Sequence, residues 1–241
     1  MSLPVAILAG GLAKRLRPLP GQMPKSLIDV AGHPFITHQL NLLRRSGLAE
    51  VVLCVGHLGE QIQKEVGDGH RWGLRVTYVF DGPKLLGTGG ALRRALPVLG
   101  DAFFVLYGDS YLECDYLAIE KVFCEGRRLG LMTVLKNMNK WDKSNIVFKN
   151  GRIMRYDKKI RIREMEHIDY GLGILRAAAL KDYPSDISFD LVQVYQDLLS
   201  CDQLAGFEVS ERFYEIGSLE GLEETRRHII AQQGKKNELY P

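Results

Sequence analysis

The 241-residue chain lacks the features of a secreted, membrane-spanning or nucleic-acid-binding protein. Its N-terminus has no basic stretch followed by an apolar run, and no segment approaches the roughly 18 uninterrupted apolar residues of a spanning helix. The formal net charge is only +3, and no long run of Lys or Arg occurs. We therefore expect a cytoplasmic protein without a nucleic-acid or membrane partner.

Cysteines are few, and the chain shows no internal repeat, low-complexity run or linker. Cys54, Cys114, Cys124 and Cys201 have neither metal-ligand spacing nor the density of a disulfide framework, which favours reduced thiols. Cys54 lies inside the apolar stretch 51–55 and is expected in the core. Hydrophobic residues make up 46% and charged residues 25%, which is ordinary for one large globular domain.

Strand-like and helix-like segments alternate in the first half of the chain. Short apolar runs are typical of strands buried on both faces, and the segments between them have helical spacing. The expected strands are 5–8, 51–55, 74–80 and 103–107, and the expected helices are 35–46, 57–66, 89–96 and 116–125. This order predicts an α/β fold with a Rossmann-like, mostly parallel (mixed) sheet and helices on both faces.

Beyond residue 130 the pattern changes to one typical of antiparallel strands. A Lys-Asn-Gly turn separates two short strand candidates, which favours a hairpin. The expected strands are 131–135, 145–148, 152–156, 172–175, 206–209 and 213–216, and the expected helices are 189–199 and 219–233. We expect these residues to add a small antiparallel subdomain to the sheet.

Two glycines follow the first expected strand directly. Gly10 and Gly11 let the backbone turn sharply and bring its N–H groups close to a ligand. The turn continues into Lys14, Arg15 and Arg17 and contains no acid, a combination that suits the polyphosphate of a nucleoside triphosphate. Two glycines alone are more often only a turn. No Gly-Lys-Ser/Thr closes the loop as in a P-loop, and the dinucleotide spacing Gly-x-Gly-x-x-Gly is missing.

A second chemical candidate follows another expected strand. Asp109 comes directly after residues 103–107 and Gly108, and ligands of open α/β sheets gather at the carboxyl ends of strands. A carboxylate at such an end suits a hard cation such as Mg²⁺. The alternative is an ordinary turn cap, and the phosphate-type loop in the same sheet favours the metal.

Together these residues carry a family resemblance, in a set of motifs that occur in order from about residue 3 to 230. The motifs are Leu8-Ala9-Gly10-Gly11 through Arg15-Leu16, Pro24-Lys25, Gly67 to Leu74, Leu86-Gly87-Thr88-Gly89-Gly90-Ala91, Gly108-Asp109-Ser110, Tyr156-Asp157-Lys158 and Phe213-Tyr214-Glu215-Ile216-Gly217. The chain resembles the sugar-1-phosphate nucleotidyltransferases, in particular compact bacterial members such as the heptose-1-phosphate guanylyltransferases and N-acetylmuramate-1-phosphate uridylyltransferases. The resemblance implies one nucleotidyltransferase domain, 1–233, with a nucleotide-binding half (1–110) and a sugar-phosphate-binding half (111–233), followed by a polar tail (234–241).

The implied reaction joins a sugar 1-phosphate to the α-phosphorus of a nucleoside triphosphate and releases pyrophosphate. Such chemistry depends on in-line positioning and on neutralising phosphate charge. The resemblance makes Arg15 a contact of the β- and γ-phosphates and Lys25 a contact of the α-phosphate. The other implied roles are nucleotide binding for Leu8, Ala9, Gly10, Gly11, Lys14, Thr88 and Gly89, substrate binding for Asp157, Lys158 and Asp169, and Mg²⁺ binding for Asp109 and Glu215.

Simpler interpretations exist for each of these side chains. Arg15 and Lys25 could be solvated surface cations. Lys158 belongs to the basic stretch 158–163, which fits a solvated face nearly as well. Asp157 could end a strand, Asp169 could pair with a backbone group, and Glu215 could be an ordinary edge-strand charge.

The sequence departs from the family pattern at several of these positions. Ala13 and Lys14 replace the usual glycine and threonine of the loop, and Asp157 replaces the usual glutamate. Asp169 stands for an asparagine, and Glu215 for an aspartate. These changes affect the identity of the sugar and the metal geometry more than the reaction class, and two aspartates facing the acceptor would suit a hydroxyl-rich or amino-bearing sugar.

The base, the acceptor class and the assembly stay open from sequence. GTP is favoured over UTP and CTP, although Lys84, which only donates hydrogen bonds, fits a carbonyl-bearing pyrimidine as well. A transferase for a non-sugar phosphate or phosphonate and a non-catalytic nucleotide-sensing subunit are the alternatives. We expect a monomer or a homodimer.

Overall fold

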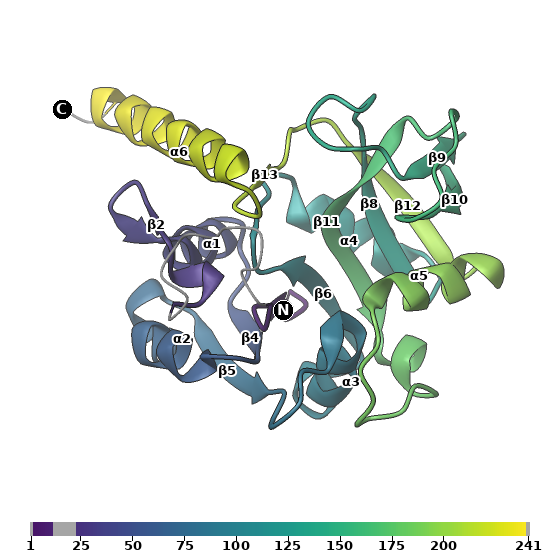
Figure 1. Ribbon diagram of the computed structural model, residues 1–241, viewed down its shortest axis with the longest axis horizontal. Helices are drawn as coiled ribbons and strands as arrows, with labels where there is room; N and C mark the ends of the chain where they lie inside the picture. Colours follow the sequence, from purple (N-terminus) through teal and green to yellow (C-terminus); the bar gives the residue numbers. More distant parts are fainter. Residues whose placement is uncertain (1, 12–22, 240–241) are drawn as a thin grey trace.

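A nine-stranded mixed sheet forms the centre of the protein, seen in a computed structural model that describes residues 2–11 and 23–239, the side chains of 235–239 excepted. The strand order is β10-β9-β11-β6-β1-β4-β5, and β8 pairs with β11 and β12 off this path (Figure 1). The sheet strands are β1 (Val5–Leu8), β4 (Glu50–Val55), β5 (Arg75–Phe80), β6 (Ala102–Tyr107), β8 (Gly130–Lys136), β9 (Ile146–Lys149), β10 (Arg152–Tyr156), β11 (His167–Arg176) and β12 (Leu204–Val209).

Parallel pairing is confined to two parts of this sheet, the pair β8 and β12 and the group β1, β4, β5 and β6. β1 pairs in parallel with β4 and β6, and β4 with β5, so the carboxyl ends of these four strands meet at one edge. β11 runs antiparallel to β6 and β8, and β9 and β10 form the expected hairpin. The predicted α/β fold with a mixed sheet and an antiparallel part is confirmed.

Helices cover both faces of the sheet because the strands alternate their side chains between two cores. Val5 and Ile7 of β1 face a core shared with three helices, whereas Ala6 faces a second core shared with two others. The first group is α1 (Phe35–Arg45), α2 (Gly59–Val66) and α4 (Tyr116–Glu125), and the second is α3 (Gly87–Leu99) and α5 (Leu191–Ser200). The long helix α6 (Leu219–Leu239) packs beside β2 (Asp29–Val30), at the upper left of Figure 1. No helix among the described residues is long and apolar enough to cross a membrane.

Several boundaries differ from the sequence expectation. β11 is ten residues long, whereas the sequence predicted a strand only at 172–175. Its first half was missed because it carries the polar residues His167 and Asp169 and a glycine, Gly171, at φ +97°. α3 contains Pro97, which the fold accepts inside the helix. α6 continues to Leu239 instead of ending near residue 233.

Several very short elements went unrecognised in the sequence. They are β2, β3 (His33–Pro34) and β7 (Ser110–Tyr111), with the 3-10 turns Lys25–Leu27, His70–Trp72 and Ala177–Leu180. The strand predicted at 213–216 is present as the shorter β13 (Tyr214–Glu215). β7 and β13 pair with each other and place Ser110 opposite Glu215. The pairing of β7 with β13 brings the segment just before α6 next to the turn that follows β6.

Candidate active site

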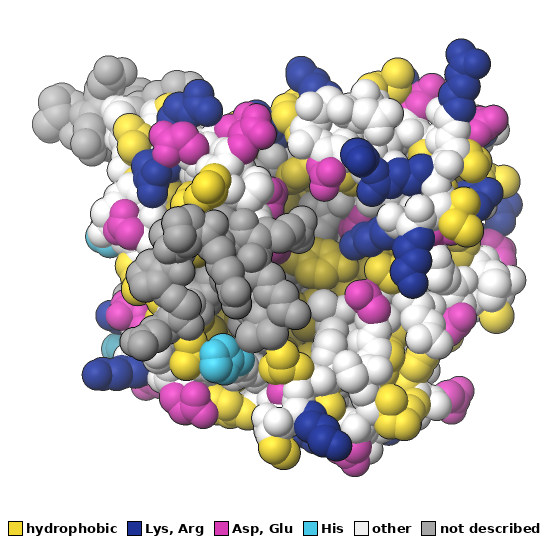
Figure 2. Space-filling view, viewed as in Figure 1, with side chains coloured by type: hydrophobic (Ala, Val, Ile, Leu, Met, Phe, Trp, Pro, Cys, Tyr) yellow, Lys and Arg dark blue, Asp and Glu magenta, His cyan; other side chains and the backbone are white. Residues whose placement is uncertain are grey.

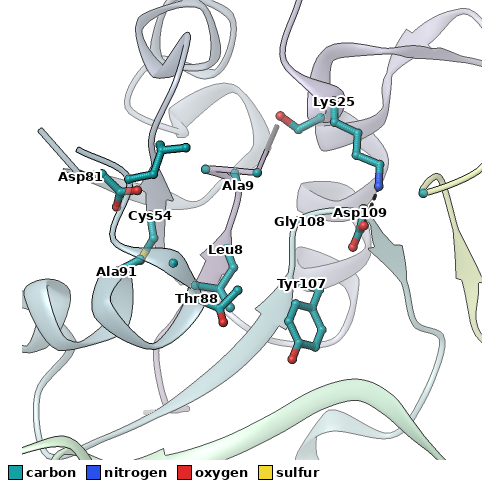
Figure 3. Close-up of a pocket in the computed structure, with 16 residues that line it drawn as sticks. Leu8, Ala9, Lys25, Cys54, Asp81, Thr88, Ala91, Tyr107, Gly108 and Asp109 are labelled. Atoms are coloured by element: carbon teal, nitrogen blue, oxygen red, sulfur yellow. Dashed lines mark hydrogen bonds and ion pairs between the residues drawn. The ribbon is translucent and has the colours of Figure 1, made fainter. Parts of the chain in front are cut away.

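A cavity of about 440 Å³ opens at the carboxyl ends of the parallel strands (Figure 3). It is lined by the ends of β1, β4 and β6, by the segment after β5 and by the start of α3. The lining residues are Leu8, Ala9, Gly10, Gly11, Lys25, Ser26, Cys54, Asp81, Leu85, Gly87, Thr88, Ala91, Tyr107, Gly108, Asp109 and Gly217. The cavity therefore gathers most of the residues predicted for the nucleotide.

Glycines allow the backbone segments around this cavity to pack closely against one another. A Cβ on Gly108 would lie 2.6 Å from the carbonyl oxygen of Leu8, and one on Gly10 would lie 3.0 Å from the amide nitrogen of Gly56. Gly11, in contrast, has nothing within 4 Å of its Cβ direction. The backbone after β1 thus packs tightly on one side and is open on the other. Lys14 and Arg15, for which the sequence predicts contacts with the nucleotide, lie outside the described residues.

Lys25 and Asp109 form an ion pair at the wall of the cavity, with Nζ 2.6 Å from Oδ2. Figure 3 shows the lysine extended towards the carboxylate. The turn that carries Asp109 is held by Gln39, a residue that no motif in the sequence marks. The Gln39 amide of α1 donates to the carbonyl oxygens of Tyr107 (3.1 Å) and Ser110 (2.8 Å), on either side of Asp109.

Glu215 lies next to this pair because β13 pairs with β7. The amide of Ile216 donates to the carbonyl oxygen of Asp109 at 2.9 Å. Burial and the negative charge of Asp109 raise the pKa of Glu215, while Gly217 N–H, Lys25 and the Ser218 hydroxyl act in the opposite direction. Two neighbouring carboxylates, of which one is destabilised as an anion, fit a divalent cation.

Gly217 is the residue that leaves room for this arrangement. A Cβ at that position would overlap the Glu215 carboxylate and would lie 3.1 Å from Lys25 Nζ. No group of three or more His, Cys, Asp and Glu side chains forms a metal cluster within the described ranges. Two carboxylates are still sufficient for Mg²⁺, which commonly takes its other ligands from water and substrate phosphates.

The residues predicted for the sugar phosphate lie beside the cavity and meet it at Tyr107. Lys158 Nζ lies 3.2 Å from Asp169 Oδ2 and 5.2 Å from the centre of the Tyr107 ring. The Tyr156 hydroxyl donates to Asp169 at 3.0 Å, and the Asp169 side chain is only 4% exposed. Lys158 and Asp169 are therefore brought together, and Lys158 covers an aromatic wall of the cavity.

Asp157 has a different local role from the other two. Its Oδ1 accepts the amides of Lys159 and Ile160, both at 2.8 Å, and these bonds lower the pKa of its carboxyl. The carboxylate thus shapes the turn after β10. Its predicted contact with the acceptor stays a prediction.

Thr88 and Gly89 also serve the packing of α3 against α5. The Thr88 hydroxyl donates to Asp190 Oδ1 (3.1 Å) and accepts the Leu191 amide (2.8 Å), yet Thr88 still lines the cavity. Gly89 does not line it. A Cβ on Gly89 would overlap the Phe189 ring.

We expect Gly89→Ala to lower the free energy of unfolding by about 2 kcal/mol, since overpacking a buried contact costs on the order of 1–3 kcal/mol. Urea unfolding followed by circular dichroism measures the change. Gly234→Ala is the matched control, because nothing lies within 4 Å of its Cβ direction in helix α6. A Gly89→Ala protein as stable as the control would contradict the packing role.

Asp81 is a cavity residue that sequence reasoning missed. The residue is 6% exposed, lines the cavity and accepts the Leu86 amide at Oδ2 (3.2 Å). Burial raises the pKa of its carboxyl, against the opposing effects of the Leu86 amide and Arg94. Asp81 directly follows the apolar strand β5, much as Asp109 follows β6 after one glycine, and this position in the sequence could have identified it.

The raised pKa of Asp81 predicts a pH dependence of stability. Above the ordinary value of 3.8 the folded state binds more protons here than the unfolded chain, so this group makes the free energy of unfolding fall as pH rises. Asp81→Asn removes the titration and should make that fall shallower in urea titrations from about pH 4 to 7. Asp182→Asn, at an exposed position, is the control. Parallel profiles for Asp81→Asn and the unaltered protein would contradict the prediction.

Comparison with known proteins identifies the family. The family model described as nucleotidyl transferase matches residues 5–144, and the chain belongs to this family. The family resemblance predicted from the ordered motifs is thereby confirmed.

Among curated relatives, the UTP–glucose-1-phosphate uridylyltransferase of Synechocystis is 28% identical over 201 residues, covering 77% of this chain and 52% of that protein. The N-acetylmuramate α-1-phosphate uridylyltransferase of Neisseria meningitidis is 40% identical over 113 residues, 46% of this chain and 49% of that protein. The chain spans about half the length of the curated relatives it matches.

Solved structures show the same fold. HddC from Yersinia pseudotuberculosis complexed with GMP-PN superposes with a TM-score of 0.78 at 24% identity, covering 94% of this chain and 99% of that chain. The inositol-1-phosphate CTP transferase of T. maritima gives a TM-score of 0.74 at 21% identity, covering 94% and 95%.

Proposed function

We propose that the protein transfers a nucleotidyl group from a nucleoside triphosphate to a sugar 1-phosphate, forming a nucleotide-sugar and releasing pyrophosphate. The observation that carries the proposal is the pairing of Lys25 with Asp109 in the wall of the cavity that Gly10 and Gly11 line, with Glu215 next to this pair. The names of the curated relatives, which include uridylyl-, guanylyl- and thymidylyltransferases of sugar 1-phosphates, support the same reaction.

In this proposal each side of the cavity handles one substrate. The backbone of residues 8–11 and the Thr88 region bind the nucleotide, with Lys14 and Arg15 assigned to the phosphates. Lys25 stabilises the negative charge that grows at the α-phosphate. Asp109 and Glu215 would hold Mg²⁺, which lowers the repulsion between the two anionic substrates.

The acceptor belongs on the Tyr107 side of the cavity. The Lys158 side chain is partly exposed and its ammonium group lies above the Tyr107 ring, where it can contact the acceptor phosphate. Asp169 holds that lysine and is itself held by Tyr156. Because Lys158 and Tyr156 already satisfy Asp169, an amino-bearing acceptor is less favoured than a hydroxyl-rich one.

GTP is the proposed nucleotide, and Asp81 supports this choice. A carboxylate only accepts hydrogen bonds, and guanine offers two adjacent donors, N1–H and the N2 amino group, on its Watson–Crick edge. Uracil offers one ring donor between two carbonyl groups, which a carboxylate would repel. The curated relatives include guanylyltransferases as well as uridylyl- and thymidylyltransferases, so the choice of GTP depends on Asp81.

The test is pyrophosphate release with Mg²⁺, each of GTP, UTP, CTP and dTTP, and a panel of sugar 1-phosphates with inositol 1-phosphate included. No release with any pair would refute the proposal. We expect GTP to give the highest kcat/KM, and Asp81→Asn to lower the GTP value by about 10- to 100-fold, since a bidentate base contact contributes about 1–3 kcal/mol. An equal loss with all four triphosphates would contradict base reading by Asp81.

A further inference from the structure

Gln39 is a buried amide on the core side of α1. The residue is 1% exposed, and Ile36, Leu40 and Leu43 of the same helix are fully buried in the hydrophobic core. An apolar side chain would fill such a position without the desolvation of a polar group. A polar group that is kept in a core therefore calls for an interaction that offsets its burial.

One end of the Gln39 side chain makes this interaction. Its Nε2 donates to the carbonyl oxygens of Tyr107 at 3.1 Å and of Ser110 at 2.8 Å. Its Oε1 is buried and has no hydrogen-bond partner in the part of the chain that the structure describes. A buried oxygen without a partner is unfavourable, but turning the amide over would set that oxygen against two carbonyl groups. The amide thus has one orientation, in which it holds both ends of the turn 107–110.

The Asp109 carboxylate takes its position from this turn. Within residues 2–11 and 23–239, its hydrogen-bond partner is Lys25 alone, and the Asp109 side chain is 31% exposed. In the proposed reaction Lys25 also has to face the α-phosphate, so it is not a fixed support for the carboxylate. The direction in which Asp109 faces the cavity therefore depends on the backbone to which Gln39 is bound.

Backbone hydrogen bonds hold the same turn from two other sides. Gly108 N–H donates to the Leu8 carbonyl oxygen at 3.1 Å, and Ile216 N–H donates to that of Asp109 at 2.9 Å. These bonds come from β1 and from the segment after β13, whereas Gln39 comes from α1. A side-chain substitution leaves the backbone bonds in place and removes those of Gln39. The contribution of Gln39 can therefore be measured separately.

Gln39 acts on the site from behind the cavity wall. It is not among the described residues that line the cavity, whose hollow lies near the centre of Figure 2. Because Gln39 is only 1% exposed, its amide has no access to a substrate or an ion. Any effect of the residue on the reaction must therefore pass through the turn 107–110.

We propose that Gln39 is a positioning residue for the nucleotidyl transfer. Its amide fixes the turn 107–110 so that the Asp109 carboxylate faces the divalent ion and Lys25. This inference rests on the proposed function, because it takes Asp109 to bind the ion there. It adds a residue that contacts neither substrate nor metal and still determines the rate.

Gln39→Met tests the role, since methionine keeps an unbranched side chain of similar length and loses both N–H donors. With Mn²⁺ alone as the probe for the ion, electron paramagnetic resonance of the free ion measures its affinity for the protein. We expect this affinity to fall about tenfold, on the scale of the two hydrogen bonds that are lost. Pyrophosphate release should show a kcat lower by about 10- to 100-fold with both KM values within about threefold, because misplacement of a reacting group acts in the transition state.

Ile36→Val is the matched control on the same helix. It removes one buried carbon and no hydrogen bond, so it lowers stability without altering the turn. Urea unfolding shows whether the two variants are comparably stable. Ile36→Val should leave the Mn²⁺ affinity and kcat within about twofold. Gln39→Asn, whose amide is one carbon too short to reach the turn, should repeat the losses of Gln39→Met and serves in its place if that variant does not fold.

Three results would overturn the positioning role. They are a Mn²⁺ affinity that is the same in the Gln39 variants and Ile36→Val, a kcat that falls equally in all of them, and the absence of Mn²⁺ binding by the unaltered protein.

The positioning role and the proposed reaction fail separately. A tenfold loss of Mn²⁺ affinity in a protein that releases no pyrophosphate with any substrate pair would retain Gln39 as a support of Asp109 and reject the reaction. Pyrophosphate release at equal rates by Gln39→Met and Ile36→Val would retain the reaction and reject the role of Gln39.

Discussion

Asp109→Asn is expected to reduce kcat by about a thousandfold, the scale on which removing a charge-stabilising group from a preorganised site acts. The substitution keeps the size of the side chain but removes the charge that pairs with Lys25 and lies beside Glu215. Pyrophosphate release at saturating substrates measures kcat, and a Mg²⁺ titration should show a weaker dependence on the ion.

Asp101→Asn is the control for this variant. Asp101 is exposed and lies before β6, at the opposite end of the strand that leads to Asp109. Its substitution should leave kcat within about twofold. If the Asp109→Asn protein folds normally and keeps more than about a tenth of kcat, Asp109 has no essential part in the reaction.

Lys25→Met should lower kcat by about 100- to 1,000-fold with a smaller change in the KM for the triphosphate. The Lys25 side chain is 16% exposed, so its interaction with a growing phosphate charge is poorly screened by water. A contact that strengthens in the transition state affects kcat more than substrate binding.

The same variant has an effect that needs no substrate. Lys25 lowers the pKa of Glu215, so its removal leaves two neighbouring carboxylates without their cation and should raise that pKa further. We expect the free energy of unfolding of Lys25→Met to be lower, between about pH 5 and 8, than that of Lys64→Met, which changes an exposed lysine of α2.

For the kinetic prediction, a change in KM alone, with kcat preserved, would assign Lys25 to ground-state binding.

Local patterns were sufficient for most of the framework. The apolar runs of β1, β4 and β6 and the amphipathic spacing of α1 and α4 appear in the sequence almost as they do in the structure. Gly10, Gly11 and Asp109 were recognisable because they directly follow buried strands. These features depend on neighbours within a few residues, which a single sequence displays.

The remaining features depend on distant contacts. The two-residue strand β7 has no periodicity of its own, and only its pairing with β13 places Glu215 beside Asp109. Gln39 looked like any polar residue of a helix, although its amide holds the turn around Asp109. Asp157 matched a substrate-binding motif, but its carboxylate is bound to amides two and three residues further on.

The order of residues along the chain was thus enough to establish the family, the α/β framework and the chemical nature of the groups that flank the first turn. Folding was needed to establish which of those groups share one cavity, that Asp81 and Tyr107 belong to it, and that Lys158 lies above Tyr107. The reason is physical: strand and helix formation follow from nearby side chains, whereas the charge around Glu215 is set by Asp109 and Lys25, which are more than a hundred positions away in the sequence.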